Sequence, residues 1–125
     1  MSHKARVLLI GLDPKVVDYA SLPTPLDEPT LRTALAADER RLCDLGYDAS
    51  WLFIDRGESA VSVVTARLGA ERFDCILVGA GIRTIAPLFP LFEQMVNAIH
   101  AGAPGAKIAF NTNPNDTTEA VQRWV

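Results

Sequence analysis

A glycine-rich stretch that ends in an arginine is the part of this sequence best suited to binding chemistry. Gly79 and Gly81 directly follow an apolar run, and Arg83 comes two residues after the second glycine. Glycine lets a ligand approach the backbone closely, and the arginine guanidinium matches the shape of a carboxylate or phosphate. The pattern predicts that an anionic group binds at this turn.

Small and polar residues also follow two other apolar runs, and they would meet Arg83 if these runs are parallel strands. Ligands of open parallel sheets bind at the carboxyl ends of the strands. We expect Thr84 to cap the turn after it. The free backbone N–H groups of that turn would favour an anion. The candidate ligand-binding residues are Gly11, Asp13, Gly79, Gly81, Arg83, Thr84, Asn111 and Thr112.

The same residues also fit an enzyme, and they fit purely structural roles as well. As catalytic candidates, Asp13 would be a general base and Arg83 its electrophilic partner in a proton transfer or a hydrolysis. Alternatively, Arg83 pairs with Asp13 or Asp116, the glycines only form turns, and the asparagines of residues 111–116 are turn and cap residues. The sequence leaves open whether the protein is an enzyme.

The sequence matches no standard cofactor or nucleophile motif. The glycine stretch has Thr84 where a dinucleotide-binding fingerprint has its third glycine, and it follows the third apolar run instead of the first. No Gly-x-Ser-x-Gly elbow is present, and no His, Cys or carboxylate cluster has metal-ligand spacing. We predict no metal, leave the cofactor unknown, and expect Cys43 and Cys75 to be core residues.

The composition is typical of a single globular domain spanning residues 1–125. Hydrophobic residues make up 49% of the chain and charged residues 22%. A formal net charge of −3 argues against a nucleic-acid partner, because such proteins need a clustered basic face. The first apolar run is too short for a signal peptide or a membrane span. We therefore expect a cytoplasmic protein with reduced thiols and no membrane partner.

Apolar runs alternate with helical patterns along the chain. Continuous runs of Val, Ile, Leu and Phe predict strands buried on both faces at Arg6 to Leu12, Ala49 to Ile54, Cys75 to Val78 and Lys107 to Phe110. Helical periodicity predicts helices at about 29–45, 59–68, 87–101 (or from 90) and from 115 or 116. In the first helix Asp38 is expected on the solvent side, and Asp116 with Glu119 predicts a capping box.

This alternation predicts an α/β fold with a parallel sheet covered by helices on both faces. The expected strand order is 2-1-3-4, which gives a three-layer flavodoxin-like, or Rossmann-like, domain with a four-stranded sheet. The segment from Asp13 to Glu28 is long for a strand-to-helix connection. It is either a lid over the ligand site or a stiff surface loop, and its candidate contact groups are Lys15, Asp18, Tyr19 and Ser21.

The strand that begins at Lys107 would form one edge of this sheet. A second copy of the chain would cover such an edge, so a homodimer is one expectation, with Trp124 and Val125 as its apolar contact. The alternative is that Trp124 packs on the sheet of its own chain.

The layout resembles the receiver domains of two-component signalling. Asp13 falls where that family has acids after its first strand, and Thr112 falls near its switch threonine. Gly79 occupies the phosphoacceptor position, so the resemblance implies the fold without phosphotransfer. A third hypothesis is therefore a receiver-like, non-catalytic interaction module.

A closer similarity is to a group of short bacterial proteins of unknown function. It extends over nearly the whole chain and is clearest around Val78 to Arg83 and Ala106 to Pro114. This resemblance implies a free-standing domain and no particular activity.

Overall fold

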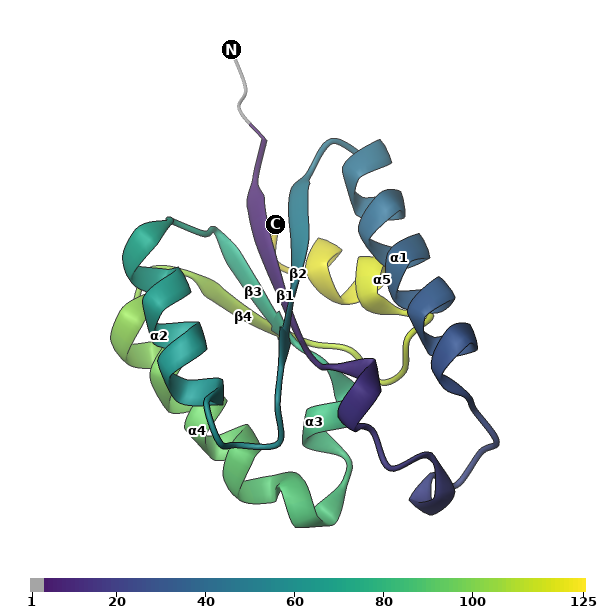
Figure 1. Cartoon of the computed structure of the whole chain (residues 1–125). Helices are drawn as coiled ribbons and strands as arrows, with labels where there is room; N and C mark the ends of the chain where they lie inside the picture. Colours follow the sequence, from purple (N-terminus) through teal and green to yellow (C-terminus); the bar gives the residue numbers. More distant parts are fainter. Residues whose placement is uncertain (1–3) are drawn as a thin grey trace.

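The structure is a computed structural model that describes residues 4–125, and it contains a four-stranded parallel sheet (Figure 1). The strands are β1 (Arg6–Leu12), β2 (Asp48–Ile54), β3 (Cys75–Val78) and β4 (Lys107–Phe110), in the order β2-β1-β3-β4. The helices are α1 (Glu28–Asp44), α2 (Ala60–Ala70), α3 (Ala80–Arg83), α4 (Phe89–Gly102) and α5 (Thr117–Gln122). The predicted α/β fold and strand order are confirmed.

The helices form two layers, because strand side chains alternate between the two faces of the sheet. On one face α2 and α4 cover Leu8, Ile10, Ile76 and Val78 (Figure 1). On the other face α1 and α5 cover Val7, Leu9, Cys75 and Leu77. All eight side chains are completely buried, and each large one contributes about 1.5–3 kcal/mol through burial. The expectation of strands buried on both faces is therefore correct for β1 and β3, whereas most side chains of the edge strands β2 and β4 are half-buried or exposed.

Local sequence sets several of the helix ends. The Asp27 carboxylate accepts a hydrogen bond from the backbone N–H of Thr30 at 2.9 Å and so caps the start of α1. Gly46, just after α1, has a φ of 98°, a left-handed conformation that suits glycine. Before α2, the hydroxyl and N–H of Ser59 and the N–H of Gly57 donate to Asp55. These hydrogen bonds lower the pKa of Asp55 to about 2.

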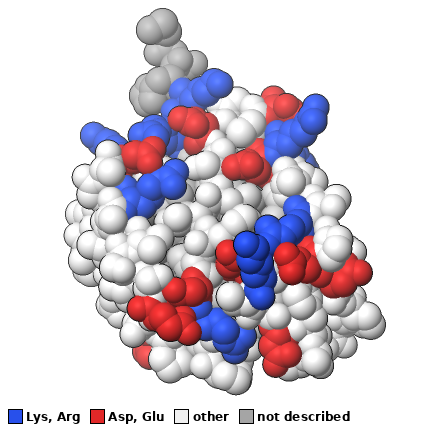
Figure 2. Space-filling view, in the orientation of Figure 1, with Lys and Arg blue, Asp and Glu red and all other residues white. Residues whose placement is uncertain are grey.

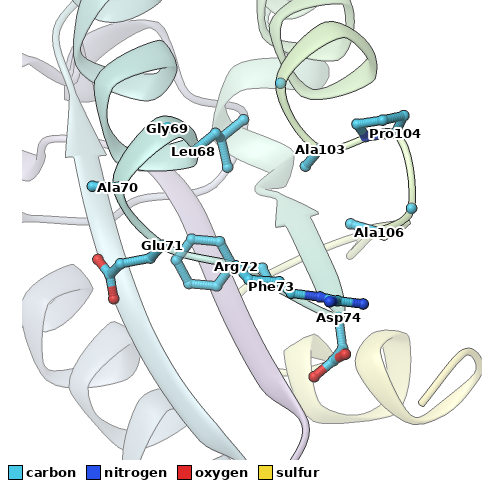
Figure 3. Close-up of a pocket in the computed structure, with 12 residues that line it drawn as sticks. Leu68, Gly69, Ala70, Glu71, Arg72, Phe73, Asp74, Ala103, Pro104 and Ala106 are labelled. Carbon is cyan, nitrogen blue, oxygen red and sulfur yellow. The ribbon is translucent and has the colours of Figure 1, made fainter.

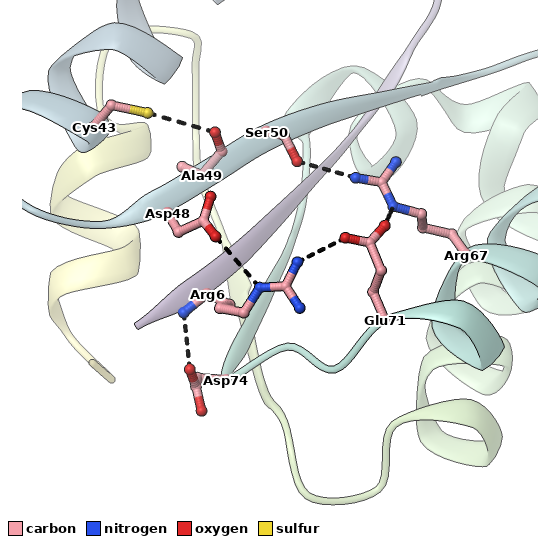
Figure 4. A network of polar contacts seen from close by, with 8 residues as sticks. All are labelled: Arg6, Cys43, Asp48, Ala49, Ser50, Arg67, Glu71 and Asp74. Carbon is pink, nitrogen blue, oxygen red and sulfur yellow. Dashed lines mark hydrogen bonds and ion pairs between the residues drawn. The ribbon is translucent and has the colours of Figure 1, made fainter. Parts of the chain in front are cut away.

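The amino ends of the strands are joined by an ion-pair network (Figure 4). The Arg6 guanidinium contacts Glu71 at 2.6 Å and Asp48 at 3.4 Å. Arg67 also pairs with Glu71, and both arginines lie over the Phe73 ring, at 5.2 and 5.8 Å from its centroid. The hydrogen bond from Arg6 lowers the pKa of Glu71. Because these groups are partly exposed, each pair contributes only modestly to stability.

The two edges of the sheet differ. At the β2 edge, the Trp51 N–H donates to Glu39 of α1 at 3.1 Å, and the Cys43 sulfur lies 3.5 Å from the Ala49 carbonyl oxygen (Figure 4). At the β4 edge, a guanidinium N–H of Arg123 donates to the Phe110 carbonyl at 2.9 Å. Within residues 4–125, no strand pairs with the outer side of β4.

The two cysteines occupy different environments. Cys75 is completely buried, as expected, and burial raises the pKa of its thiol to about 11. Cys43 lies on α1 and is exposed, so the expectation that it is a core residue is wrong. The helical stripe that faces the sheet passes through Leu42 instead.

The long connection from β1 to α1 is held in place by its own hydrogen bonds. It contains two short 3₁₀ turns, Pro14–Val16 and Tyr19–Ser21. The Tyr19 hydroxyl donates to the Pro14 carbonyl at 2.7 Å, and Arg56 donates to the Val16 carbonyl at 3.0 Å. The first contact lies within the loop, and the second attaches the loop to the connection that follows β2.

Candidate functional site

The carboxyl ends of β1 and β3 lie side by side, as the sequence predicted. Ile10 pairs with Val78 in the sheet, and the Gly79 N–H donates to the Ile10 carbonyl at 2.8 Å. Gly11 and Gly79 are therefore neighbours. The chain leaves β1 toward α1 on one face and leaves β3 toward α4 on the other (Figure 1). This is the switch point at which open α/β sheets bind their ligands.

Close packing explains why glycine stands at two of the three candidate positions, Gly11 and Gly79. A Cβ atom on Gly11 would lie 2.9 Å from Cζ3 of Trp51, and a Cβ atom on Gly79 would lie 3.2 Å from the Ile10 oxygen. Both distances are shorter than ordinary contacts. Gly81 is exposed, and a Cβ atom there would meet nothing within 4 Å. Only Gly81 therefore leaves open space at this edge.

The residues after Gly79 form a short helix, α3, where the sequence predicted only a turn. The Thr84 hydroxyl donates back to the Ala80 carbonyl at 2.7 Å. Thr84 thus closes α3, and the expectation that it caps the following turn is wrong. At the start of α3, the Ala80 N–H already donates to Oδ1 of Asn111 at 2.7 Å.

Arg83 is half-buried and makes one hydrogen bond. One terminal N–H group donates to the Asn111 carbonyl at 2.6 Å, whereas its Nε atom is buried without a hydrogen-bond partner among the described residues. Among residues 4–125 no carboxylate lies within ion-pairing distance of Arg83. The alternative in which it pairs with Asp13 or Asp116 is therefore wrong. Its charge stays at the carboxyl edge without a nearby counter-ion.

Asp13 is directed toward α1. Its carboxylate accepts a hydrogen bond from the Lys15 N–H at 2.9 Å and lies 3.6 Å from Nη2 of Arg32. Both contacts lie on the β1–α1 connection or on α1 itself. The structure therefore shows no contact that joins Asp13 to Arg83 in one catalytic pair.

A chain of buried polar groups runs from α3 to α1 through Asn111. Asn111 accepts from the Ala80 N–H, and its own Nδ2 donates to the Thr117 hydroxyl at 2.9 Å. The Thr117 hydroxyl in turn donates to Oδ2 of Asp38 at 2.8 Å. The exposed fractions of Asn111, Thr117 and Asp38 are 3%, 0% and 7%. This chain fixes the position of the residue whose carbonyl holds Arg83.

The sequence interpretation missed Thr117 and placed Asp38 on the solvent side, which is wrong. The spacing of Asp38 from neighbouring leucines already indicated that it is buried. Asp38 follows Leu35 by three residues and precedes Leu42 by four, so it lies on the same helical stripe as these leucines. A carboxylate on an apolar stripe needs a hydrogen-bonding partner, and Thr117 supplies it.

Burial raises the pKa of Asp38, and the hydrogen bond from Thr117 only partly opposes this effect. The folded state thus holds the Asp38 proton more tightly than the unfolded state does. The contribution of Asp38 to stability therefore falls as the pH rises from about 4 through the raised pKa. We expect Asp38→Asn to be more stable than the wild type at pH 7, since an amide oxygen can still accept from Thr117.

Urea unfolding of Asp38→Asn and of the wild type across a pH series checks this expectation. The difference in unfolding free energy should shrink as the pH falls toward 3, where both side chains are neutral (the ordinary pKa is about 3.9). Asp44→Asn, on the exposed end of the same helix, is the matched control and should show no such trend. A variant less stable than the wild type at pH 7 would contradict the prediction.

Thr112 and Asp116 form a closed local arrangement. The Thr112 hydroxyl and N–H donate to the Asp116 carboxylate at 2.5 and 2.9 Å. Burial favours a raised pKa for Asp116, but the hydrogen bonds from Thr112 outweigh it and lower the pKa. The predicted capping box is absent, because Asp116 faces this loop and Glu119 pairs with Arg41 of α1 at 2.9 Å.

Two surface hollows lie away from the candidate residues. One, of about 500 Å³, lies at the amino ends of β3 and β4 and is lined by residues 68–74 and 102–106 (Figure 3). The other, of about 900 Å³, is an open groove between α2 and α4. None of the candidate ligand residues borders either one. On the face in Figure 2, acidic and basic side chains are interspersed, so this face carries no broad patch of a single charge.

Compared with known proteins, the chain matches no family model and shows no significant similarity to a curated protein. Within residues 4–125, no helix is long and apolar enough to cross a bilayer. In the same range, no group of three or more His, Cys, Asp or Glu residues is placed to hold a metal ion.

Proposed function

We propose that the protein binds a small anionic ligand at the carboxyl edge between β1 and β3, with Arg83 as the anion-binding group. The observation that carries this proposal is a half-buried guanidinium positioned by the Asn111 carbonyl and without a carboxylate partner among residues 4–125. Removing a charge from water costs free energy unless it is paired. A carboxylate or phosphate beside Arg83 would offset that cost.

The hydrogen bonds already made at this edge reduce the number of groups that can contact the anion. Thr84, Asn111 and Thr112 use their side chains within the protein, so they position the site and leave contact with the anion to others. Gly81, two residues before Arg83, is exposed, and a Cβ atom there would meet nothing within 4 Å. The proposed contact set is thus Arg83 with the backbone around Gly81.

Thermal unfolding with added inorganic phosphate, and separately with small carboxylates, tests the proposal. Phosphate should raise the melting temperature of the wild type in a concentration-dependent way, because a ligand that binds only the folded state stabilises it. Arg83→Ala should abolish the shift while remaining folded. Arg72→Ala removes an exposed arginine far from this edge and should keep the shift.

Equal shifts in all three proteins, or none in the wild type with any of these anions, would contradict the proposal. If Arg83→Ala does not fold, Arg83 is a structural residue and the proposal loses its main support. Arg32 and the Lys15 N–H hold the Asp13 carboxylate, the candidate general base, so the proposed role of this edge is binding.

A further inference from the structure

We propose that two copies of this chain associate through the outer edges of their β4 strands, which pair antiparallel and join the two sheets into one. The starting observation is that no strand within residues 4–125 occupies that edge. An unpaired strand edge presents a row of backbone N–H and C=O groups to any other chain that can pair with it.

The direction of the β4 backbone groups fixes how two copies would pair. The Lys107 N–H donates inward to the Asp74 carbonyl at 2.9 Å. Because backbone groups alternate in direction along a strand, those of Ala109 also face β3, whereas those of Ile108 and Phe110 face outward. Antiparallel pairing centred on Ala109 places Ile108 opposite Phe110 of the second copy. Each such pair exchanges both of its N–H···O hydrogen bonds.

The opposite edge of the sheet is less suited to such pairing. Along β2, the outward-facing N–H of Trp51 donates to Glu39, and the Ala49 carbonyl contacts Cys43. On β4, Arg123 uses one lone pair of the Phe110 carbonyl and leaves the second for a strand partner. Side chains thus occupy more of the β2 edge than of the β4 edge, which makes β4 the better place for a new strand to add.

An apolar stripe on α4 runs beside the β4 edge. Phe92 packs edge-on against Phe110 of β4, with ring centroids 5.7 Å apart, and Phe89 lies next to Phe92 at 6.3 Å. Phe89 is 53% exposed, and Phe92 and Val96 are half-buried. Val96 lies one turn after Phe92, on the same side of the helix. This stripe is separate from Met95 and the other completely buried residues of α4.

The apolar stripe on α4 favours a second copy of the chain, and not an unrelated extended peptide, as the partner of the β4 edge. A two-fold axis perpendicular to the sheet puts both α4 helices on the same face, so their stripes meet across the paired strands. A four-residue strand alone is too small for a stable interface, which typically buries about 800 Å² on each partner. A peptide would use the backbone groups but leave Phe89 exposed, whereas a second copy covers both.

Sedimentation velocity over a range of concentrations, combined with hydrogen exchange of backbone amides, tests this interface. The wild type should dimerise as its concentration rises, and the amides of Ile108 and Phe110 should become protected in parallel. Ile108→Pro removes an outward N–H that has no partner within residues 4–125, and proline is tolerated on edge strands. This variant should be monomeric, whereas Ile108→Val, which keeps the N–H, should dimerise like the wild type.

A second variant keeps the test decisive if Ile108→Pro does not fold. Phe89→Glu changes an exposed side chain, so it should fold normally and weaken the dimer at least tenfold. A wild type that stays monomeric at millimolar concentration would overturn the proposal. A dimer in which the amides of Ile108 and Phe110 exchange as fast as in the monomer would also overturn it. The same holds for a dimer that Trp124→Glu dissociates but that neither Ile108→Pro nor Phe89→Glu affects.

Discussion

Asn111→Ala is expected to lower the free energy of unfolding by about 2–3 kcal/mol, because it removes the centre of the buried polar chain. The substitution leaves the Ala80 N–H without its acceptor and takes away the donor that reaches Thr117. It also opens a small cavity at a position that is only 3% exposed. Urea denaturation followed by circular dichroism measures the change.

Asn115→Ala is the matched control, since Asn115 is exposed on the same loop and its side chain makes no hydrogen bond in the structure. Its unfolding free energy should stay within about 0.5 kcal/mol of the wild type. Equal losses for the two variants would show that the loop as a whole, and not the buried amide, stabilises this edge. A folded Asn111→Ala protein should also bind phosphate less tightly, because the carbonyl that holds Arg83 loses its support.

Gly11→Ala is expected to cost about 1–3 kcal/mol of stability, the usual penalty for overpacking a well-filled site. The added methyl group would lie 2.9 Å from the Trp51 ring. That ring stacks on Phe53 at 5.7 Å and donates from its indole N–H to the Leu35 carbonyl at 2.8 Å. Trp51 therefore cannot move aside without losing other contacts. Chemical denaturation provides the measurement.

Gly81→Ala is the contrasting substitution at the same edge. The new Cβ atom meets nothing within 4 Å, and alanine favours the helical backbone of α3, so stability should be unchanged or slightly higher. If Gly11→Ala is as well tolerated as Gly81→Ala, the packing explanation for Gly11 is wrong. A loss of phosphate binding in stable Gly81→Ala would place the anion against the α3 backbone.

The four strands and the helices other than α3 could be predicted, because they are encoded locally. The runs that form β1 and β3 are continuously apolar, which is typical of strands covered on both faces. The start of α1 follows from the capping Asp27, and its end from Gly46. Once strands and helices alternate, few topologies remain, and the order β2-β1-β3-β4 is one of them.

The roles of individual polar side chains could not be predicted in the same way, because they depend on contacts between distant segments. Asp38 and Thr117 meet across 79 residues, and Arg41 pairs with Glu119 across 78. The capping-box pattern at Asp116 was misleading for the same reason, since Glu119 found a partner on α1. The sequence made Arg83 a candidate anion-binding residue, but its contact with a backbone carbonyl has no sequence signature.

Side chains occupy more outward backbone groups at the β2 edge than at the β4 edge, and this difference would limit the size of an assembly built by the proposed pairing. Open filaments form when a surface can add copies at both ends, whereas a self-complementary contact at one end closes after two. Side chains of α1 occupy two outward groups of β2, so the proposed pairing at β4 would give a finite pair. If two copies pair as proposed, Glu39 and Cys43 would help to keep the β2 edges of the pair from adding further strands.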